Sequence, residues 1–411
     1  MDSLTLLYDC KTKVLQRFFI AKNNKQKHRF LHVPLKKILV AADMATHPCV
    51  GGNIQCIMQY VENLRALGFD VYYLLIGTQG LSADAIRSTL AYWGDHGFYY
   101  PVPGWQNFMQ RAYKRLTYQA YPDNIDFYYP FGLNSYINRL HRLHGFSGLI
   151  VNYIWESRLA FCNIPIKAIY THDVFAYRDE RMAAGCNWHH HSVAEEARGV
   201  RRFPYIFAIQ DVERDYFRYL APKSDVRSVY SSFQFVEQPV TGSKNILFFS
   251  GGGDLNIEAI QRFIRGVYPS LLEQDANIHL LIGGNICSYL NPDELPRNVE
   301  LKGRYDNPAN FYIQGDICIN PVFEGSGLKI KTFEALAYGK VTIVDPHSSI
   351  GIYRSEKSPL IIARTAEEYV SAVKKYMQND FALKERRRLC KEYIESLNNY
   401  ILEQYSAVFG N

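Results

Sequence analysis

The sequence predicts an α/β protein with two domains, each built on a doubly wound parallel sheet. Short apolar strands alternate with longer amphipathic helices along most of the chain, which is the pattern of parallel strands joined by crossover helices. Many of these strands end in glycines, at the strand ends where open α/β sheets bind ligands. The length of 411 residues is too great for one ordinary core and suits two domains.

The composition favours a globular protein of a reducing compartment. Apolar residues make up 47% of the chain, and no run of about 18 apolar residues predicts a transmembrane helix. The start of the chain has a short apolar patch without a small-residue cleavage site, so we expect no secretory signal. The eight cysteines are scattered without a C-x-x-C pair, as free thiols in the cytoplasm are.

The run His189-His190-His191 raises the question of a metal site. Neighbouring residues on a chain do not converge on one ion without an unusual backbone, and no Cys or Asp stands at ligand spacing. We therefore expect no metal and no cofactor.

Residues 1–36 form a basic N-terminal extension. From Lys11 to Lys37 there are nine Lys or Arg and no Asp or Glu, interleaved with Phe and Ile side chains. Such a segment can rest on an anionic membrane surface, or it can be a solvated extension packed on the domain, and both interpretations stay open. Nucleic-acid binding is not expected, because the basic residues are confined to this segment and no recognised module is present.

The first domain is predicted to span residues 37–238 and begins with a βαβ unit. A strand at 36–43 leads through Gly51-Gly52 into a helix with apolar residues on one face, Gly68 ends that helix, and the next strand covers 70–76. The G-x-G-x-x-G fingerprint of dinucleotide sites is absent.

An aromatic and basic region follows between Trp93 and Pro130, with one helix expected from Trp105 to Tyr118. Its aromatic residues can form a surface for a sugar or lipid acceptor, but aromatic residues at helical spacing are more often core, and we favour core. Strands at 148–151 and 167–170 come next.

The second of these strands runs into Thr171-His172-Asp173. A His-Asp pair directly after a strand lies where α/β sheets carry functional residues, although a His there can also tie a loop. A helix at 195–200, a strand at 205–210 and a further helix then lead to a polar connector at 235–244, where we place the domain boundary.

The second domain, predicted to span residues 239–390, repeats the alternation, and residues 391–411 form a terminal helix that can pack back on the first domain. Strands are expected at 245–249, 278–282, 299–302, 317–320, 341–344 and 360–363. The strand at 317–320 enters a Gly-Ser-Gly turn that opens a helix. Glycines admit a ligand close to the backbone, and a helix N-terminus flanked by Lys329 and Lys331 favours phosphate.

These segments together resemble the donor-binding domain of retaining GT-B glycosyltransferases, in particular the family 4 group (glycosyl transferases group 1). The resemblance rests on 246–251, on 281–284, on 299–303, on Asp316 to Pro321, and on Gly325-Ser326-Gly327-Leu328-Lys329-Ile330-Lys331 with Glu334 to Lys340. It covers about 120 residues strongly and extends more faintly to Gly51-Gly52 and Thr171-His172-Asp173.

The resemblance implies the GT-B fold, two Rossmann-like domains facing across a cleft, with a nucleotide-sugar donor, a carbohydrate or lipid-linked acceptor, and no catalytic metal. Glu334 resembles the acid that holds the ribose hydroxyls. The other donor-binding residues that the resemblance implies are Gly51, Gly52, Gly252, Gly253, Arg304, Tyr305, Ser326, Gly327, Leu328, Lys329 and Lys331. The candidate catalytic residues are His172, Asp173 and Glu324.

One departure from the family pattern concerns the spacing of its two glutamates. The family places them eight positions apart, whereas Glu324 and Glu334 stand ten apart. We expect a cytoplasmic glycosyltransferase, peripheral to the membrane if the basic extension binds it, acting in polysaccharide or glycoconjugate synthesis. The alternatives are a non-catalytic GT-B scaffold that binds nucleotide-sugars, and a GT-B epimerase or hydrolase of nucleotide-sugars.

Overall fold

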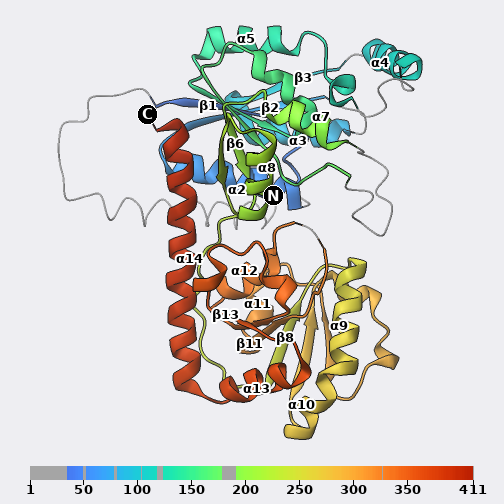
Figure 1. Ribbon diagram of the computed structural model, residues 1–411, viewed down its shortest axis with the longest axis vertical. Helices are drawn as coiled ribbons and strands as arrows, with labels where there is room; N and C mark the ends of the chain where they lie inside the picture. The colour runs from blue at the N-terminus through green and yellow to red at the C-terminus, as the bar shows by residue number, and fades with distance from the viewer. Residues whose placement is uncertain are drawn as a thin grey trace, which may run out of the picture. The chain divides into compact units, whose positions relative to one another are not determined.

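The computed structural model describes residues 35–49, 52–77, 81–102, 104–117, 124–177, 191–325 and 327–410. The chain divides into two compact units (Figure 1). Unit 1 consists of Met1–Ala208, Glu213–Val229 and Leu402–Asn411, and unit 2 of Ile209–Val212 and Tyr230–Ile401. The change of unit at Val229 precedes the polar connector at 235–244. Most of the basic extension, together with Gly51, His189, His190 and Ser326, lies outside the described residues.

The described residues of unit 1 form a seven-stranded parallel sheet with the order β3-β2-β1-β4-β5-β6-β7. The direction of winding reverses between β1 and β4, so the sheet is doubly wound. Its strands are β1 Lys37–Ala42, β2 Asp70–Ile76, β3 Gly97–Tyr100, β4 Gly148–Asn152, β5 Ile166–Tyr170, β6 Tyr205–Ala208 and β7 Asp225–Ser228.

Helices cover both faces of this sheet because its strands carry apolar residues on both sides. Leu39 and Leu74 face a core built with α5, α7 and the 3-10 helices η2 and η3. On the other face Tyr73 stacks on Trp93 of α3 with ring centroids 5.0 Å apart. The helices are α2 Gly52–Ala66, α3 Ala83–Trp93, η1 Gly94–His96, α4 Gly104–Thr117, η2 Ile125–Tyr128, α5 Leu133–His144, η3 Ile154–Phe161, α7 Val193–Val200 and α8 Asp211–Leu220.

The described residues of unit 2 form a six-stranded parallel sheet with the order β10-β9-β8-β11-β12-β13. Counted from the start of the unit this is the order 3-2-1-4-5-6 of Rossmann-like sheets, with the reversal between β8 and β11. Its strands are β8 Asn245–Phe249, β9 His279–Gly283, β10 Val299–Gly303, β11 Ile317–Asn320, β12 Val341–Val344 and β13 Leu360–Ile362.

Alternate residues of these strands point to opposite faces of the sheet, where they pack into two separate hydrophobic cores. Ile246 and Phe248 pack with α9, α10 and α13, whereas Leu247 packs on the opposite face with α11 and α12. The helices are α9 Asp254–Gly266, α10 Tyr268–Gln274, η4 Asn285–Tyr289, η5 Pro292–Glu294, α11 Ala309–Tyr312, α12 Ile330–Ala337, η6 Pro346–Ser349, η7 Ser355–Lys357, α13 Ala366–Tyr376 and α14 Asp380–Phe409.

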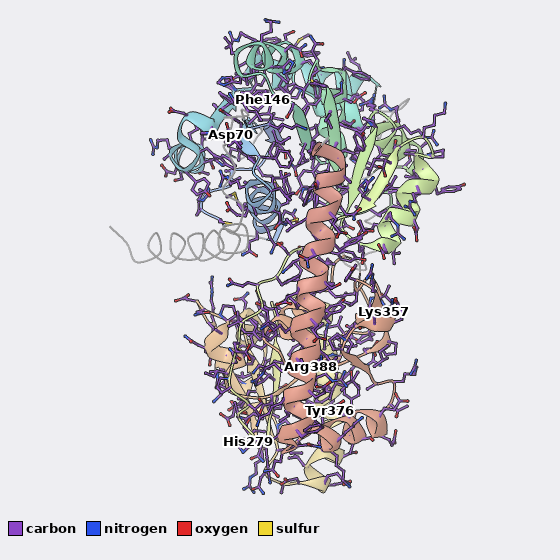
Figure 2. The ribbon with its side chains drawn as sticks, turned by 90° about the vertical axis from the view of Figure 1, so that its left-hand side faces the viewer. Asp70, Phe146, His279, Lys357, Tyr376 and Arg388 are labelled. Carbon is purple, nitrogen blue, oxygen red and sulfur yellow. The ribbon has the colours of Figure 1, made fainter. Side chains whose placement is uncertain are left out.

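The long helix α14 belongs to both units. Its last turns are part of unit 1, where Tyr405 meets Phe207 edge to face with ring centroids 5.3 Å apart. Earlier in the helix, exposed Arg388 pairs with Glu385 and Glu392 on the outer side of α14 (Figure 2). Neither α14 nor any other helix within the described ranges is long and apolar enough to cross a bilayer.

The alternation predicted from the sequence is confirmed, with two kinds of error. Strands β3 and β7 and helices α3, α5 and α10 were not predicted. Edge strand β7 lacks a continuous apolar run, whereas β3 lies inside the segment that was interpreted as an aromatic and basic region. The interpretation of the aromatic residues in the Trp105 to Tyr118 helix as core is wrong for Trp105 and Phe108, and the side chains of Tyr113 and Tyr118 lie outside those that the structure describes. Trp105 is 63% exposed and Phe108 is 70% exposed, so the helical spacing of aromatic residues did not show which side of the helix faces the core.

Candidate active site

Two loops leave the sheet of unit 2 at its point of reversal. Strand β8 ends in Ser250 to Gly253 before α9, and strand β11 ends in Pro321 to Lys329 before α12. Because β8 and β11 are neighbours whose crossover helices lie on opposite faces, their loops diverge beyond the carboxyl ends of the strands. This is the position at which open α/β sheets bind ligands.

The β11 loop requires glycine at two positions. Gly325 and Gly327 have φ of 116° and 82°, which side chains with a Cβ rarely adopt. His347 from η6, at the end of the next strand, ties the loop down, since its Nε2 lies 2.8 Å from the carbonyl oxygen of Gly325. The Ser348 hydroxyl adds a hydrogen bond of 2.7 Å to the carbonyl oxygen of Val322.

Two lysines stand at the junction of this loop and α12. The Lys329 ammonium donates to the carbonyl oxygen of Gly325 at 3.2 Å, and that of Lys331 donates to Oδ1 of Asn256 on α9. Within the described ranges neither lysine forms an ion pair with Asp or Glu. Two uncompensated positive charges at a helix N-terminus favour an anion.

Burial lowers the pKa of both lysine side chains. Desolvation lowers the pKa of Lys331 to about 8, and the neighbouring charge of Lys329 contributes. The pKa of Lys329 is also lowered by desolvation. An anion bound beside them would restore the charged forms, because an opposite charge raises a lysine pKa.

Glu334 lies on the next turn of α12 and titrates near neutrality. It is half-buried, and the hydroxyl of Tyr312 donates to its Oε2 at 3.3 Å. Desolvation raises the pKa of Glu334 to about 7, partly opposed by this hydrogen bond. Tyr312 is held in place by stacking on Tyr338, with ring centroids 4.4 Å apart.

The loop after β8 carries glycines, whose backbone a ligand can approach closely, rather than charged side chains. A Cβ on Gly252 would lie 2.1 Å from the ring of Tyr289, so a larger residue there would have to displace that exposed ring. The carbonyl oxygen of Gly253 accepts the first hydrogen bonds of α9.

The remaining predicted donor-site residues of unit 2 differ in their surroundings. Tyr305 packs against Phe249 and accepts a hydrogen bond of 2.9 Å from Gln314, whereas Arg304 is exposed. Leu328 is half-buried. Glu324 is exposed and forms no hydrogen bond with the described residues.

In unit 1, His172 directly follows β5 and belongs to a buried polar network. Its φ of 62° is uncommon for a residue with a Cβ and places the ring against Tyr153, with centroids 4.5 Å apart. Nε2 of His172 lies 2.7 Å from Oδ1 of Asn152, which also accepts from the Tyr60 hydroxyl at 3.0 Å. The amide nitrogen of Asn152 donates to the carbonyl oxygen of Ala41 at 3.0 Å, which fixes the orientation of the amide.

This network determines the state of the His172 imidazole. Because Oδ1 of Asn152 is an acceptor, Nε2 carries the hydrogen, and Nδ1 is left with the lone pair. Burial lowers the pKa of His172 to about 3, so the ring is neutral at physiological pH. Asp173 does not pair with this ring; its Oδ1 accepts from the backbone N–H of Val174 at 2.8 Å. Gly52 begins α2 with open space around its Cα.

The sequence interpretation missed His347, Asn256, Tyr312 and Asn152. Each contacts a predicted site residue from another element, and only the position of His347 and Asn152 at strand ends offered a signal. Among the described residues no group of three or more His, Cys, Asp or Glu could hold a metal ion, and the described cysteines are free.

Residues 243–379 match the family model of glycosyl transferases group 1. The matched range contains the glycine loops, Lys329, Lys331 and Glu334. Unit 2 carries a glycosyl transferases group 1 domain. No curated protein matches the chain by sequence.

Solved structures show that the similarity of fold extends over both units. TarM is 12% identical, with a TM-score of 0.64 over 93% of this chain and 100% of that one. Sucrose-phosphate synthase of Thermosynechococcus elongatus is 13% identical, with a TM-score of 0.59 over 91% and 98%. HepE of Anabaena, in complex with UDP, is 10% identical, with a TM-score of 0.59 over 91% and 100%. The predicted GT-B fold is confirmed.

Proposed function

We propose that this protein transfers a sugar from a nucleotide-sugar to a carbohydrate or lipid-linked acceptor, with retention of anomeric configuration and without a metal. The observation that carries the proposal is the arrangement on α12. Lys329 and Lys331, without acidic partners among the described residues, stand at its N-terminus, one turn before half-buried Glu334. The arrangement lies inside the matched glycosyltransferase domain.

The two lysines suit the leaving group of glycosyl transfer. The nucleoside diphosphate gains negative charge as the glycosidic bond to phosphate breaks, and the lysines and the N-terminus of α12 stabilise that charge in place. Such groups are already oriented before the reaction, so they favour the transition state over the bound donor. The glycines of the β8 and β11 loops let backbone N–H groups approach the same phosphates.

Glu334 suits the ribose. An ionised carboxylate accepts two hydrogen bonds from neighbouring hydroxyls, and Tyr312 leaves the rest of its acceptor capacity available. Arg304 and Tyr305 are the residues proposed beside the base.

In a retaining mechanism the oxygen of the leaving phosphate takes the proton of the acceptor hydroxyl, so no separate general base is needed. Neutral His172 fits this scheme, because its pKa of about 3 makes it a poor proton acceptor. With Nε2 directed at Asn152, the lone pair of Nδ1 is suited to accept a hydrogen bond from a sugar hydroxyl. Glu324 is proposed to meet the transferred sugar, and Asp173 to hold the backbone after His172.

Uridine diphosphate is the first nucleotide to test. HepE is named in complexes with UDP and with UDP and glucose, and a TarM variant of S. aureus in a complex with UDP, α-GlcNAc-glycerol and fondaparinux. These names support a UDP-sugar donor and a carbohydrate acceptor here. The proposal also assigns the protein to family 4, with a role in polysaccharide or glycoconjugate synthesis. It includes a cytoplasmic location and membrane contact through residues 11–37.

The test measures nucleotide release by the purified chain from a panel of nucleotide-sugars, with and without carbohydrate acceptors. Acceptor-dependent release that Glu334→Gln abolishes and Lys357→Ala leaves intact supports transfer. Lys357 is an exposed lysine of the same unit, outside the site (Figure 2). Acceptor-independent release would indicate a hydrolase, and nucleotide binding without any turnover a scaffold; either result rejects the proposal.

A further inference from the structure

An open pocket lies at the edge of the unit 2 sheet, between strand β13 and helices α13 and α14. Its volume is about 490 Å³. Pockets that hold small molecules usually measure about 300–1,000 Å³, so the size suits a ligand. Strand β12 separates β13 from β11, and none of the lining residues belongs to the candidate donor site. The pocket is therefore a second place on unit 2 where a small molecule can bind.

The backbone of β13 offers hydrogen-bonding groups to this pocket. The N–H of Ala363 donates to the carbonyl oxygen of Val344 on β12 at 2.9 Å. Because backbone groups of successive residues point to opposite sides of a strand, those of Leu360 and Ile362 point away from β12. Strand β13 is the last strand of the described sheet, so no further strand pairs with them. These N–H and C=O groups are available to the hydroxyl groups of a ligand.

Helix α13 lines the pocket with one face, and the charge of this face changes sign along the helix. The lining residues recur every four positions and are Glu367, Glu368, Ser371, Ala372, Lys375 and Tyr376. Residues at that spacing share one side of a helix. Eight residues of helix span about 12 Å, so the acidic and basic ends of the pocket are about that far apart.

Two cations meet at the basic end, around the ring of Tyr376. Nζ of Lys375 lies 5.4 Å from the ring centroid, and Cζ of Arg386, on α14, lies 5.2 Å from it. The guanidinium of Arg386 also donates to the Tyr376 hydroxyl and, at 3.2 Å, to the carbonyl oxygen of Pro359. These bonds fix its orientation and use two of its five N–H donors.

Neither cation has an acidic partner. Within the described ranges Lys375 and Arg386 form no ion pair with Asp or Glu. The residue before Arg386 is Glu385, but its carboxylate pairs with Arg388. A guanidinium held in place beside a lysine, both without counter-ions, favours a phosphate group.

The acidic end of the pocket does not suit an anion. The carboxylate of Glu368 accepts from the backbone N–H of Arg364 at 2.5 Å, and hydrogen bonding to Thr365 lowers the pKa of Glu367, so this carboxyl is ionised. Ionised carboxylates accept hydrogen bonds from hydroxyl groups. We propose that the pocket binds a phosphorylated sugar, with its phosphate on Lys375 and Arg386 and its hydroxyl groups toward the edge of β13 and the two glutamates.

The inference goes beyond the proposed glycosyl transfer. Binding to this pocket is measured without donor or acceptor, so its failure leaves the transfer reaction untouched, and the reverse also holds.

The test is isothermal titration calorimetry of the full chain with glucose 6-phosphate, glucose and inorganic phosphate. We expect glucose 6-phosphate to bind at least about tenfold more tightly than either of the others, because each of those lacks the contacts at one end of the pocket. Saturating UDP should leave this binding unchanged, since the pocket is separate from the proposed donor site.

Two variants connect the binding to the pocket. Lys375→Glu reverses a charge at the basic end, and Ser371→Trp fills the pocket from an exposed position on α13. Each should weaken the binding of glucose 6-phosphate at least about tenfold. The matched control is Lys374→Glu, at the neighbouring exposed lysine of α13, which does not line the pocket. It should bind as the unaltered chain does, with the same circular dichroism for all variants.

Four results would overturn the proposal. Glucose 6-phosphate may fail to bind the unaltered chain, or bind both pocket variants with unchanged affinity. Displacement by UDP would place it at the donor site, and equal affinity for inorganic phosphate would reduce the pocket to a simple anion site. A dimer in solution that Ser371→Trp converts to a monomer would overturn the proposal in favour of a second copy of the chain on the edge of β13.

Discussion

The hydroxyl of Tyr312 donates a hydrogen bond to Oε2 of Glu334 at 3.3 Å, and burial raises the pKa of that carboxyl to about 7. The proposed ribose acceptor is therefore about half ionised near neutrality and becomes fully ionised only at higher pH. Lys331, at the start of the same helix, has a pKa of about 8 and loses its charge above that value.

These two groups predict a narrow, bell-shaped pH dependence. The ratio kcat/KM for the donor should rise through about pH 7, as Glu334 loses its proton, and fall above about pH 8, as Lys331 loses its own. The profile should be measured at constant ionic strength, with stability followed in parallel. A profile that stays flat from about pH 6 to 9 is incompatible with these roles.

The variant Tyr312→Phe should displace the acidic limb of this profile to higher pH. Without the hydroxyl the carboxylate loses a hydrogen bond, which is worth about 1 kcal/mol, so the limb should move by about half a pH unit to one unit. The rate at the optimum should change less than the position of the limb.

The control for this variant is Tyr376→Phe, which removes a tyrosine hydroxyl from the same unit, on α13 (Figure 2). Its profile should match that of the unaltered chain. A uniform loss of rate in Tyr312→Phe without displacement of the limb would argue that Tyr312 has only a packing role.

The variant Lys331→Met should raise KM for the donor by about 10- to 100-fold, since a hydrogen bond to a charged group is worth about 1.5–3 kcal/mol. Loss of transition-state stabilisation should lower kcat as well. Lys357→Met, which removes an exposed lysine of the same unit, should keep both constants. Unchanged donor kinetics in Lys331→Met would remove the lysine from the phosphate site.

The variant Asn152→Asp should change the titration of His172. A carboxylate beside Nε2 stabilises the imidazolium, so the pKa of His172 should rise from about 3 toward its ordinary value. NMR titration of the ring protons measures this directly. In the unaltered chain the His172 resonances should not titrate between about pH 5 and 9, and titration in that range would contradict the neutral state assigned to the ring.

The variant Asp316→Ala should destabilise unit 2. The buried Asp316 carboxylate accepts from the backbone N–H groups of Thr241 and Gly242 and from the Thr241 hydroxyl at 2.6 Å. Its removal leaves these donors without their acceptor, and we expect a loss of about 2–4 kcal/mol in the free energy of unfolding. Urea denaturation should show it, while Asp293→Ala, at an exposed carboxylate, should change stability by less than about 0.5 kcal/mol.

The sequence predicted the parts of the fold that local patterns encode. Strands β8, β11 and β12 are short apolar runs buried on both faces, so each was recognised without knowledge of its neighbours. Edge strand β7 reads Asp225–Ser228 and alternates charged with other residues, which local apolar content does not distinguish from a loop. The aromatic residues of α4 were visible in the sequence, but their exposure depends on what the rest of the unit covers.

The residues of the candidate site also fall into those that the sequence could predict and those that depend on the folded structure. Lys329, Lys331 and Glu334 are neighbours on one turn and helix, so their grouping could be predicted. Tyr312 and His347 reach them from other elements, and only the assembled sheet brings those elements together. The pKa values of Lys331 and Glu334 likewise depend on burial, which the sequence does not give.

A crystal structure of the full chain with UDP tests the central claim most directly. The account predicts the diphosphate at the N-terminus of α12 within hydrogen-bond distance of the Lys331 ammonium, and the ribose hydroxyls on the carboxylate of Glu334. A nucleotide bound elsewhere in unit 2, with Lys331 and Glu334 unliganded, would contradict it.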